Sequence, residues 1–337
     1  MGAPHGGAIR ARFDGVRGLP RALAGASMGT TWSARLAAPV GVAEHLLRAA
    51  IQGALDEVVA QMSHWEPDSD ITRYNGAPSG WVALPAAFRA VLDYGLHVAD
   101  ATDGAYDPAI GALVRAWGFG PRQRAYEPPS GPAIEAARQR GGWRRVRREG
   151  DRAWQDGGVQ LDLSAIAKGY GVDRAAWALD ALGVRDYLVE VGGELRARGN
   201  RPDGQPWRVA VEWPDSGAQA AAVVLRGQSI ATSGDYRRYF LHKDDAGVRR
   251  RYSHTLDPRN GRPVDNDVAS VTVLHPGCMQ ADAWATALTV LGLEAGLQCA
   301  RRHGLSALFI VRARAGQPQG LRMRATPGFL DCIEEAS

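Results

Sequence analysis

Cysteine is scarce in this chain, and long apolar runs are missing from it. Among 337 residues there are three cysteines, Cys278, Cys299 and Cys332. Their spacing matches no zinc motif and their odd number leaves one without a partner, so we predict neither a cysteine metal site nor a disulfide framework. No stretch approaches the roughly 18 apolar residues of a membrane-spanning helix, so we predict no transmembrane segment.

An apolar export signal is also missing from the start of the sequence. Residues 1–26 are rich in glycine and arginine and contain no apolar core of the secretory type. As the sequence stands, we expect a cytoplasmic protein. If an export signal is missing from this chain, we expect a periplasmic protein associated with the inner membrane. We treat residues 1–25 as a flexible N-terminal segment and residues 26–337 as a single domain.

A strong excess of one charge is lacking too. The 40 Lys and Arg residues stand against 36 Asp and Glu residues, for a formal net charge of +4. Two basic runs, at 144–148 and 249–251, lack the interleaved aromatic residues of a nucleic-acid surface. We interpret both as solvated strand edges or turns and expect no nucleic-acid partner. The hydrophobic content of 45% is enough for a substantial core.

The first third of the chain contains one predicted strand and two predicted helices. Residues 26–36 have the β-branched and aromatic composition of a strand, and Gly29 within it suggests a close backbone approach. Apolar residues then recur at three- and four-residue steps from 43 to 62, which predicts an amphipathic helix against the core. A second helix is predicted from about Pro85 to about Ala101.

The second half of the chain reads mainly as short strands. Strands are predicted in succession from Tyr187 to Leu274, and Gly192-Gly193 is a turn of hairpin type. Only the segments around 165–182 and 278–288 read as helices in this part. Successive antiparallel strands with the helices elsewhere favour an α+β fold with largely antiparallel sheets over alternating βαβ units.

Two polar residues in a small, apolar helix form the most informative local pattern. Asp282 and Thr286 are four positions apart, so a helix places their oxygens on one face. A carboxylate and a hydroxyl are hard donors that suit Mg²⁺, which takes few protein ligands and leaves places for phosphate and water. A favourable charge in the first helical turn and a hydroxyl bonded back to a carbonyl would explain the same pair.

Other polar or aromatic residues allow both a functional and a structural interpretation. Asp162 and Lys168 flank a predicted strand-to-helix turn of small residues, where backbone N–H groups can meet an anion. Trp65 would stack on a ring or anchor its loop, and Asp107 would cap a helix that has proline at its first position. His254, just before a turn, would be a structural histidine or a base for a hydroxyl.

Seven short motifs occur in order between about Ala26 and Leu293. They are Met28-Gly29-Thr30 with Trp32, Ser63-His64-Trp65 with Asp68-Ser69, Asp103-Gly104-Ala105-Tyr106-Asp107-Pro108, Asp162-Leu163-Ser164-Ala165-Ile166-Ala167-Lys168-Gly169, Gly192-Gly193-Glu194, Ser253-His254-Thr255-Leu256-Asp257-Pro258 and Ala281-Asp282-Ala283-Trp284-Ala285-Thr286-Ala287. Each motif is weak alone, but together and in this order they are specific. In these motifs the sequence resembles the ApbE family of flavin transferases, the FAD:protein FMN transferases, which implies an ApbE-like α+β fold.

The resemblance also implies a set of site residues. FAD, as the substrate, would contact Met28, Trp65, Ala105, Tyr106, Asp107, Asp162, Lys168 and Thr255. Mg²⁺ would be held by Asp282, Thr286 and the backbone carbonyl of Ala165, and His254 would be the general base. No role follows for Gly193 or Glu194 beyond shaping the site.

The activity implied by the resemblance is transfer of FMN from FAD to a threonine or serine hydroxyl of an acceptor protein. The product would be a phosphoester-linked FMN, with release of AMP. An acceptor of this kind would carry a motif close to Asp-x-x-Thr-x-Ala-Thr. Two small departures from the family pattern, Trp284 and Thr255, affect the expected fit of the substrate more than the chemistry.

Two other functions are compatible with the same residues. In a Mg²⁺-dependent FAD pyrophosphatase, water would replace the hydroxyl and release both FMN and AMP. A non-catalytic FAD-binding protein would release no AMP at all. A redox flavoenzyme is disfavoured because the sequence lacks a nicotinamide-binding fingerprint.

Overall fold

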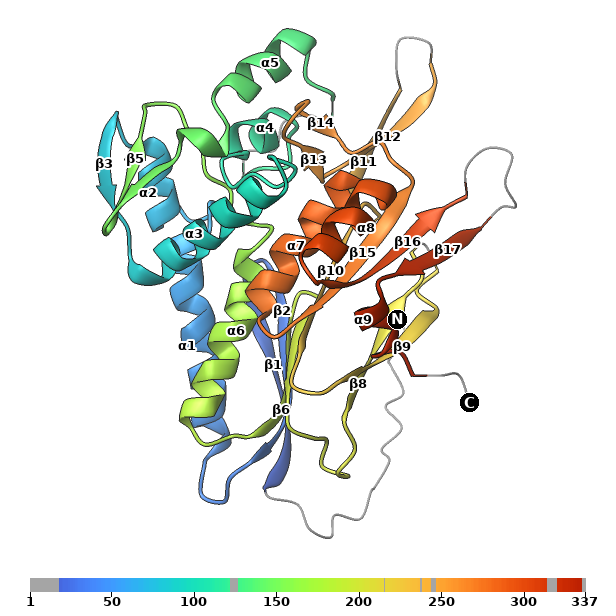
Figure 1. Cartoon of the computed structure of the whole chain (residues 1–337). Helices are drawn as coiled ribbons and strands as arrows, with labels where there is room; N and C mark the ends of the chain where they lie inside the picture. The colour runs from blue at the N-terminus through green and yellow to red at the C-terminus, as the bar shows by residue number, and fades with distance from the viewer. Residues whose placement is uncertain are drawn as a thin grey trace.

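An eight-stranded antiparallel sheet forms the centre of the molecule (Figure 1). The computed structural model describes residues 18–121, 127–214, 216–236, 238–243, 247–313 and 320–334. In the sheet the strand order is β1-β2-β6-β7-β10-β15-β16-β17, and each neighbouring pair is antiparallel. The strands are β1 (Leu19–Ser27), β2 (Thr30–Ala38), β6 (Asp186–Val191), β7 (Glu194–Arg198), β10 (Ser229–Gly234), β15 (Val268–His275), β16 (Ser306–Arg312) and β17 (Leu321–Ala325).

Four smaller antiparallel sheets occur beside the central one in the described ranges. One is three-stranded and the others are hairpins: β3 (Gly80–Ala83) with β5 (Arg152–Gln155) and β4 (Arg147–Glu149), β8 (Trp207–Glu212) with β9 (Gln219–Leu225), β11 (Tyr239–Lys243) with β12 (Arg249–Ser253), and β13 (Leu256–Asp257) with β14 (Arg262–Pro263). The sheets are thus built by antiparallel pairing, as the succession of short strands predicted, and the α+β fold is confirmed.

Three helices, α1, α6 and α7, cover one face of the central sheet (Figure 1). They are α1 (Glu44–Met62), α6 (Ala167–Ala181) and α7 (Cys278–Leu291), and α3 (Ala86–Ala101) packs against α7. The shorter helices are α2 (Asp70–Gly76), α4 (Gly111–Ala116), α5 (Gly131–Gln139), α8 (Leu293–Arg302) and α9 (Pro327–Leu330), with a 3₁₀ turn at Trp143–Arg145. The predicted helix over 43–62 is confirmed as α1, whose apolar stripe is buried.

The central sheet is apolar on both faces where β15 and β16 pair. On β16, Ala307 and Phe309 belong to the core under the helices, whereas Leu308 and Ile310 pack on the opposite side with Trp207 of β8. Alternate side chains of a strand point to opposite faces, so a continuous apolar run is what a strand buried on both sides requires. The site described below therefore rests on a sheet that is packed from both faces.

The N-terminal part differs from the prediction in two ways. The single strand expected over 26–36 is a hairpin: β1 and β2 pair from Leu19 to Ala38 and turn at Met28 and Gly29, which have φ of 54° and 71°. A Cβ on Gly29 would meet nothing within 4 Å, so this glycine permits a left-handed turn and not a close backbone approach. Residues 19–25 lie in β1, which corrects the flexible segment predicted over 1–25; residues 1–17 lie outside the described residues.

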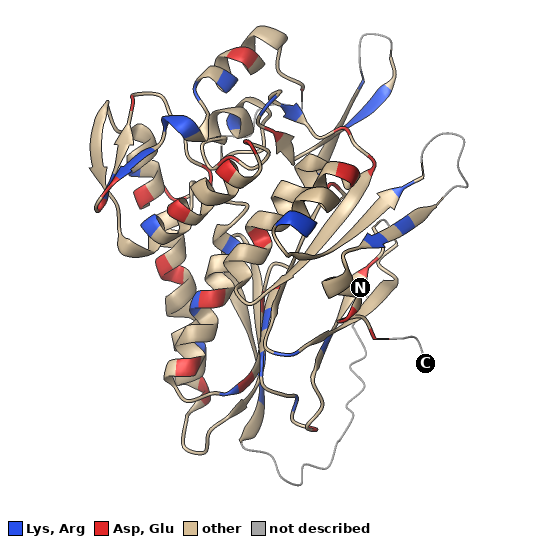
Figure 2. Cartoon of the chain, viewed as in Figure 1, with Lys and Arg blue, Asp and Glu red and all other residues tan. Residues whose placement is uncertain are grey.

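Charged residues of both signs are mixed over the fold (Figure 2). The two arginine runs lie at a 3₁₀ turn and on short strands, in agreement with the interpretation as strand edges and turns. Several of their guanidinium groups have acidic partners: Arg144 pairs with Asp103, Arg145 with Asp156, Arg148 with Asp93 and Arg251 with Asp235. Within the described ranges, no helix has the length and hydropathy to cross a membrane.

Candidate active site

A cavity of about 510 Å³ brings together almost all of the residues predicted from the sequence. Its wall contains Trp65, Ala105, Tyr106, Asp107, Asp162, Ala165, Lys168, His254, Thr255, Asp282 and Thr286. These residues come from the loops before α2, α4 and α6, from the first turn of α6, from the segment after β12 and from α7. Segments distant in sequence thus meet at one hollow beside the central sheet.

Met28 is the predicted site residue that does not line this cavity. It is half-buried in the β1–β2 turn, and its Sδ lies 2.9 Å from where a Cβ on Gly171 would stand. The Met28 side chain therefore packs against α6, the helix whose N-terminal end carries Lys168. Contact between Met28 and the flavin stays a prediction.

The predicted magnesium ligands form an oxygen-only group at the start of α6 and the middle of α7. Asp282 is buried and accepts a hydrogen bond at Oδ2 from the backbone N–H of Gly169 at 3.0 Å. Thr286 lies one turn further along α7, and Ala165 lies in the turn before α6. Both line the cavity together with Asp282. No group of three or more His, Cys, Asp or Glu residues suited to a metal occurs in the described part, but Mg²⁺ needs only one or two protein carboxylates, so this donor set fits it.

Gly169 allows the two helices that hold this group to come close together. A Cβ at Gly169 would lie 2.3 Å from the Cys278 carbonyl oxygen and 2.8 Å from the Asp282 Cβ. Only glycine fits such a contact without displacing backbone. The glycine after Lys168 in the fourth motif is thereby explained by packing.

Asp173 of α6 is a structural residue that the sequence did not reveal. Its two carboxylate oxygens accept hydrogen bonds from the backbone N–H groups of Cys278 and Met279 at 3.0 and 2.9 Å. These donors belong to the first turn of α7, which has no partner for them within the helix. The buried Asp173 therefore caps α7 from α6 and fixes the helix that carries Asp282 and Thr286. An aspartate among the small residues of a buried helix was the available signal.

Lys168 and Glu194 form an ion pair at the cavity wall, with 2.5 Å between Lys168 Nζ and Glu194 Oε1. Burial opposes the charge of the ammonium group, but the carboxylates of Glu194 and Asp282 outweigh this, so the pKa of Lys168 is raised. Burial raises the pKa of Glu194 to about 7, against the opposing effect of Lys168. Burial likewise raises the pKa of Asp282. The ammonium group stays charged at neutral pH and has three donors, of which Glu194 accepts one, so it can also donate to phosphate oxygens.

His254 has one ring nitrogen fixed and the other available. Its Nδ1 lies 3.0 Å from the backbone carbonyl oxygen of Arg238, and its ring lies edge-on to Phe119, 6.3 Å between centroids. A carbonyl can only accept, so the neutral ring carries its proton on Nδ1 and has a lone pair on Nε2. Burial, with the nearby charges of Arg238 and Lys168, lowers the pKa of His254 to about 4. At neutral pH this imidazole is therefore a free base.

Tyr106 and Trp65, two aromatic residues of the cavity wall, differ in their exposure to solvent. Tyr106 is buried, and its hydroxyl has no hydrogen-bond partner among the described residues. Burial and nearby carboxylates raise its pKa well above the ordinary value, so this hydroxyl remains a donor. Trp65 is 49% exposed at the cavity wall. A half-exposed indole and a buried hydroxyl are suited to hold the two ends of an aromatic ligand.

Asp107 does not cap a helix directly, which corrects the prediction. Its Oδ1 accepts from the Ala109 N–H at 2.7 Å and its Oδ2 from the Trp143 N–H at 3.1 Å, whereas α4 begins only at Gly111. Burial raises the pKa of Asp107 to about 6, although these backbone N–H groups oppose the shift. The carboxylate closes a local turn and ties it to the segment around Trp143.

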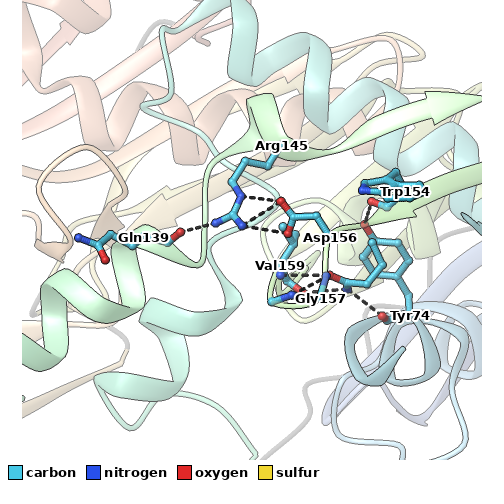
Figure 3. A network of polar contacts seen from close by, with 9 residues as sticks. Tyr74, Gln139, Arg145, Trp154, Asp156, Gly157 and Val159 are labelled. Atoms are coloured by element: carbon cyan, nitrogen blue, oxygen red, sulfur yellow. Dashed lines mark hydrogen bonds and ion pairs between the residues drawn. The ribbon is translucent and has the colours of Figure 1, made fainter. Parts of the chain in front are cut away.

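The segment just before Asp162 is held by a polar network around Trp154 and Asp156 (Figure 3). The Tyr74 hydroxyl donates to the Trp154 carbonyl at 2.8 Å, and Arg145 pairs with Asp156 at 2.9 Å. The chain reaches Asp162 a few residues later, and His64 Nδ1 lies 3.4 Å from Asp162 Oδ2. His64 lines the cavity as well, so this histidine of the second motif joins the site without having been assigned a role from the sequence.

Comparison with known proteins gives consistent results. A sequence model of the ApbE family matches residues 28–309. An FAD:protein FMN transferase of Vibrio cholerae is 39% identical over 299 residues, which cover 87% of this chain and 88% of the relative. An FAD:protein FMN transferase of Escherichia coli K12 is 35% identical over 299 residues, covering 86% and 84%. The apo structure of the flavinyl transferase ApbE of Pseudomonas stutzeri superimposes with a TM-score of 0.85 at 39% identity, covering 94% of this chain and 98% of that one.

Proposed function

The chain belongs to the ApbE family and is a flavin transferase, and we propose that it moves FMN from FAD to a threonine or serine hydroxyl of an acceptor protein in a Mg²⁺-dependent reaction that releases AMP. The observation that carries this proposal is the placement of the free base His254 in one cavity with Lys168, Asp282 and Thr286. That combination provides a proton acceptor next to groups that hold a pyrophosphate.

His254 supplies the proton acceptor for the attacking hydroxyl. Its Nδ1–H donates to the Arg238 carbonyl, which leaves Nε2 to take the proton as the hydroxyl oxygen bonds to the FMN phosphorus of FAD. The bond from that phosphorus to the bridging oxygen breaks, and AMP leaves with this oxygen. The depressed pKa of His254 keeps Nε2 unprotonated at neutral pH.

Lys168 and the oxygen group on α6 and α7 hold the other part of the substrate. The Lys168 ammonium contacts phosphate oxygens, while Asp282, Thr286 and the Ala165 carbonyl would hold Mg²⁺. When bound, this ion would neutralise charge on the pyrophosphate. Trp65, Tyr106 and the turn at Ala105–Asp107 bind the aromatic ends of FAD by stacking and hydrogen bonding, and Thr255 adds a hydroxyl at the cavity wall.

The mass of an acceptor tests the proposal. An acceptor protein that carries the Asp-x-x-Thr-x-Ala-Thr motif is incubated with this chain, FAD and Mg²⁺, with a Thr→Ala acceptor and a chelator as controls. We expect one FMN phosphoryl unit to be added to the threonine and AMP to appear in equal amount. AMP and FMN without a gain in acceptor mass would identify a pyrophosphatase instead, and the absence of both products would overturn the proposed reaction.

A further inference from the structure

Glu194 is a deeply buried acidic residue of the cavity wall to which no role has yet been assigned. It is the first residue of β7, is 3% exposed and lines the cavity. Oε1 accepts from Lys168 Nζ, whereas Oε2 is buried and has no hydrogen-bond partner among the described residues. A buried carboxylate oxygen without a donor is costly, so such an oxygen at a cavity wall indicates a ligand that supplies one.

The turn before Glu194 explains how this side chain reaches the cavity. Gly192 and Gly193 have φ of 61° and 107°, and the Gly193 N–H donates to Glu190 Oε1 at 2.8 Å. Residues that have a Cβ rarely adopt such φ values, so two glycines make the tight connection from β6 to β7 possible. The turn starts β7 with Glu194 on the cavity side, which gives the motif Gly192-Gly193-Glu194 a purpose.

The position of Glu194 within the cavity restricts the kind of donor. Its partner Lys168 and the neighbouring charge of Asp282 mark the part of the site that holds phosphate and metal. In FAD the nearest hydrogen-bond donors to the pyrophosphate are hydroxyls, of the ribityl chain on one side and of the adenosine ribose on the other. The imide and amino donors of the rings lie further away. A neutral hydroxyl is also the donor that a carboxylate already paired with Lys168 accepts without added charge.

We propose that Glu194 contacts the substrate directly, with Oε2 accepting a hydrogen bond from a sugar hydroxyl of FAD that flanks the pyrophosphate. This inference rests on the proposed function, because it requires FAD in the cavity. Glu194 thereby orients the phosphate that reacts and holds Lys168 with its other oxygen. Specificity for FAD with this hydroxyl intact follows, because its removal leaves the buried oxygen without a donor.

Binding of FAD and of deoxy analogues tests this contact. Dissociation constants are measured by flavin fluorescence for wild type, Glu194→Gln and the control Glu57→Gln, which removes a carboxylate paired with Arg174 outside the cavity. The ligands are FAD, its 2′-, 3′- and 4′-deoxyribityl forms, and its 2′- and 3′-deoxyadenosine forms. We expect Glu194→Gln to bind FAD at least tenfold more weakly and Glu57→Gln to bind it as wild type does.

Coupling between variant and analogue identifies the hydroxyl. One analogue should bind wild type at least tenfold more weakly than FAD does, yet bind Glu194→Gln no more weakly than FAD does. If a deoxyribityl analogue shows this pattern, the hydroxyl belongs to the ribityl chain. If a deoxyadenosine analogue shows it, the hydroxyl belongs to the adenosine ribose. If Glu194 only positions Lys168, Glu194→Gln should weaken the binding of FAD and of every analogue by the same factor. That result would overturn the contact.

Two further outcomes keep the contact and the proposed function separate. If Glu194→Gln does not fold, the wild-type series decides alone: equal affinity for FAD and every deoxy analogue overturns the contact. If wild type binds FAD and transfers FMN while Glu194→Gln binds FAD equally well, the contact fails and the transferase stands. If wild type does not bind FAD, the proposed function itself fails.

Discussion

The backbone N–H of Gly169 donates to Asp282 Oδ2 across 3.0 Å, and this bond joins the first turn of α6 to α7. It orients one oxygen of the carboxylate while the side chain remains at the cavity wall. The close approach that makes the bond possible depends on the absence of a side chain at Gly169. The carboxylate that we propose as a Mg²⁺ ligand is therefore held by the packing of two helices and not by α7 alone.

Gly169→Ala should damage both stability and activity. The new Cβ would lie 2.3 Å from the Cys278 carbonyl oxygen, so α6 and α7 must separate, at a cost of about 1–3 kcal/mol in the free energy of unfolding. Gly53→Ala in α1 is the matched control, since its Cβ would meet nothing within 4 Å. Urea unfolding and AMP release measure the two effects. Equal stability of the two variants would contradict the packing argument.

Asp282→Asn should abolish Mg²⁺-dependent turnover while keeping the fold. Asparagine has the size of aspartate and its Oδ1 can still accept from Gly169, but it lacks the charge that a divalent ion requires. We expect AMP release to fall at least about a hundredfold, since loss of even an outer-shell partner of a metal site costs about 10- to 100-fold. Asp180→Asn, which breaks an ion pair with Arg198 outside the cavity, should retain activity. Full activity of Asp282→Asn would remove Asp282 from the metal site.

His254→Gln should bind FAD normally and transfer FMN about 10² to 10⁴ times more slowly, because it removes the proposed general base. Because burial lowers the pKa of His254 to about 4, the neutral base persists at every pH above that value. The wild-type rate should therefore show no loss from imidazole protonation near pH 6.5. An NMR titration of the His254 ring nitrogens, assigned by comparison with His254→Gln, checks this. A midpoint near 6.5 would contradict the assigned environment, and loss of FAD binding in the variant would contradict the role as base.

Glu194 should make the stability of the metal-free protein depend on pH. Burial raises the pKa of Glu194 to about 7, whereas in the unfolded chain this pKa has its ordinary value near 4.5. Between these two pH values the native state holds a proton that the unfolded chain has released. As pH rises from about 4.5 to 7, wild type should lose roughly 1–3 kcal/mol of stability relative to Glu194→Gln. Urea unfolding at pH 5 and pH 8 in a chelating buffer measures the difference. A difference that does not change with pH would show that the carboxyl is ionised throughout.

Leu55→Ala should cost about 2–5 kcal/mol in the free energy of unfolding, because a fully buried leucine of α1 is replaced by a cavity. Leu46 of the same helix is 48% exposed, and Leu46→Ala should change stability by less than about 0.5 kcal/mol. Chemical denaturation of both variants checks the prediction. Similar losses for the two would mean that the apolar face of α1 is not the one read from the periodicity.

Several parts of this structure could be predicted from the local pattern of the sequence. The three- and four-residue spacing of α1 and the placement of Asp282 and Thr286 on one side of α7 depend only on helix geometry, so both followed from the sequence. The antiparallel strands followed from turn residues such as Gly192 and Gly193. The resemblance of the motifs to a family then indicated which of these residues share a site.

Other parts depended on contacts between segments far apart in the chain. The hairpin turn at Met28 replaced a predicted continuous strand, because the residues before it pair with β2 and a sequence window does not show pairing partners. The bond from His254 to the Arg238 carbonyl, which selects the ring tautomer, depends on the pairing of β11 with β12.

The sequence by itself determined the α+β fold, the long helices and most of the polar residues that line the cavity. Only the tertiary structure decided how these residues act together: Asp173 caps α7, Gly169 brings α7 close to α6, and Glu194 faces the cavity with one oxygen on Lys168. The physical reason is that local periodicity is set by backbone geometry within a few residues. Burial, hydrogen-bond partners and pKa shifts arise only when distant segments exclude water from one another.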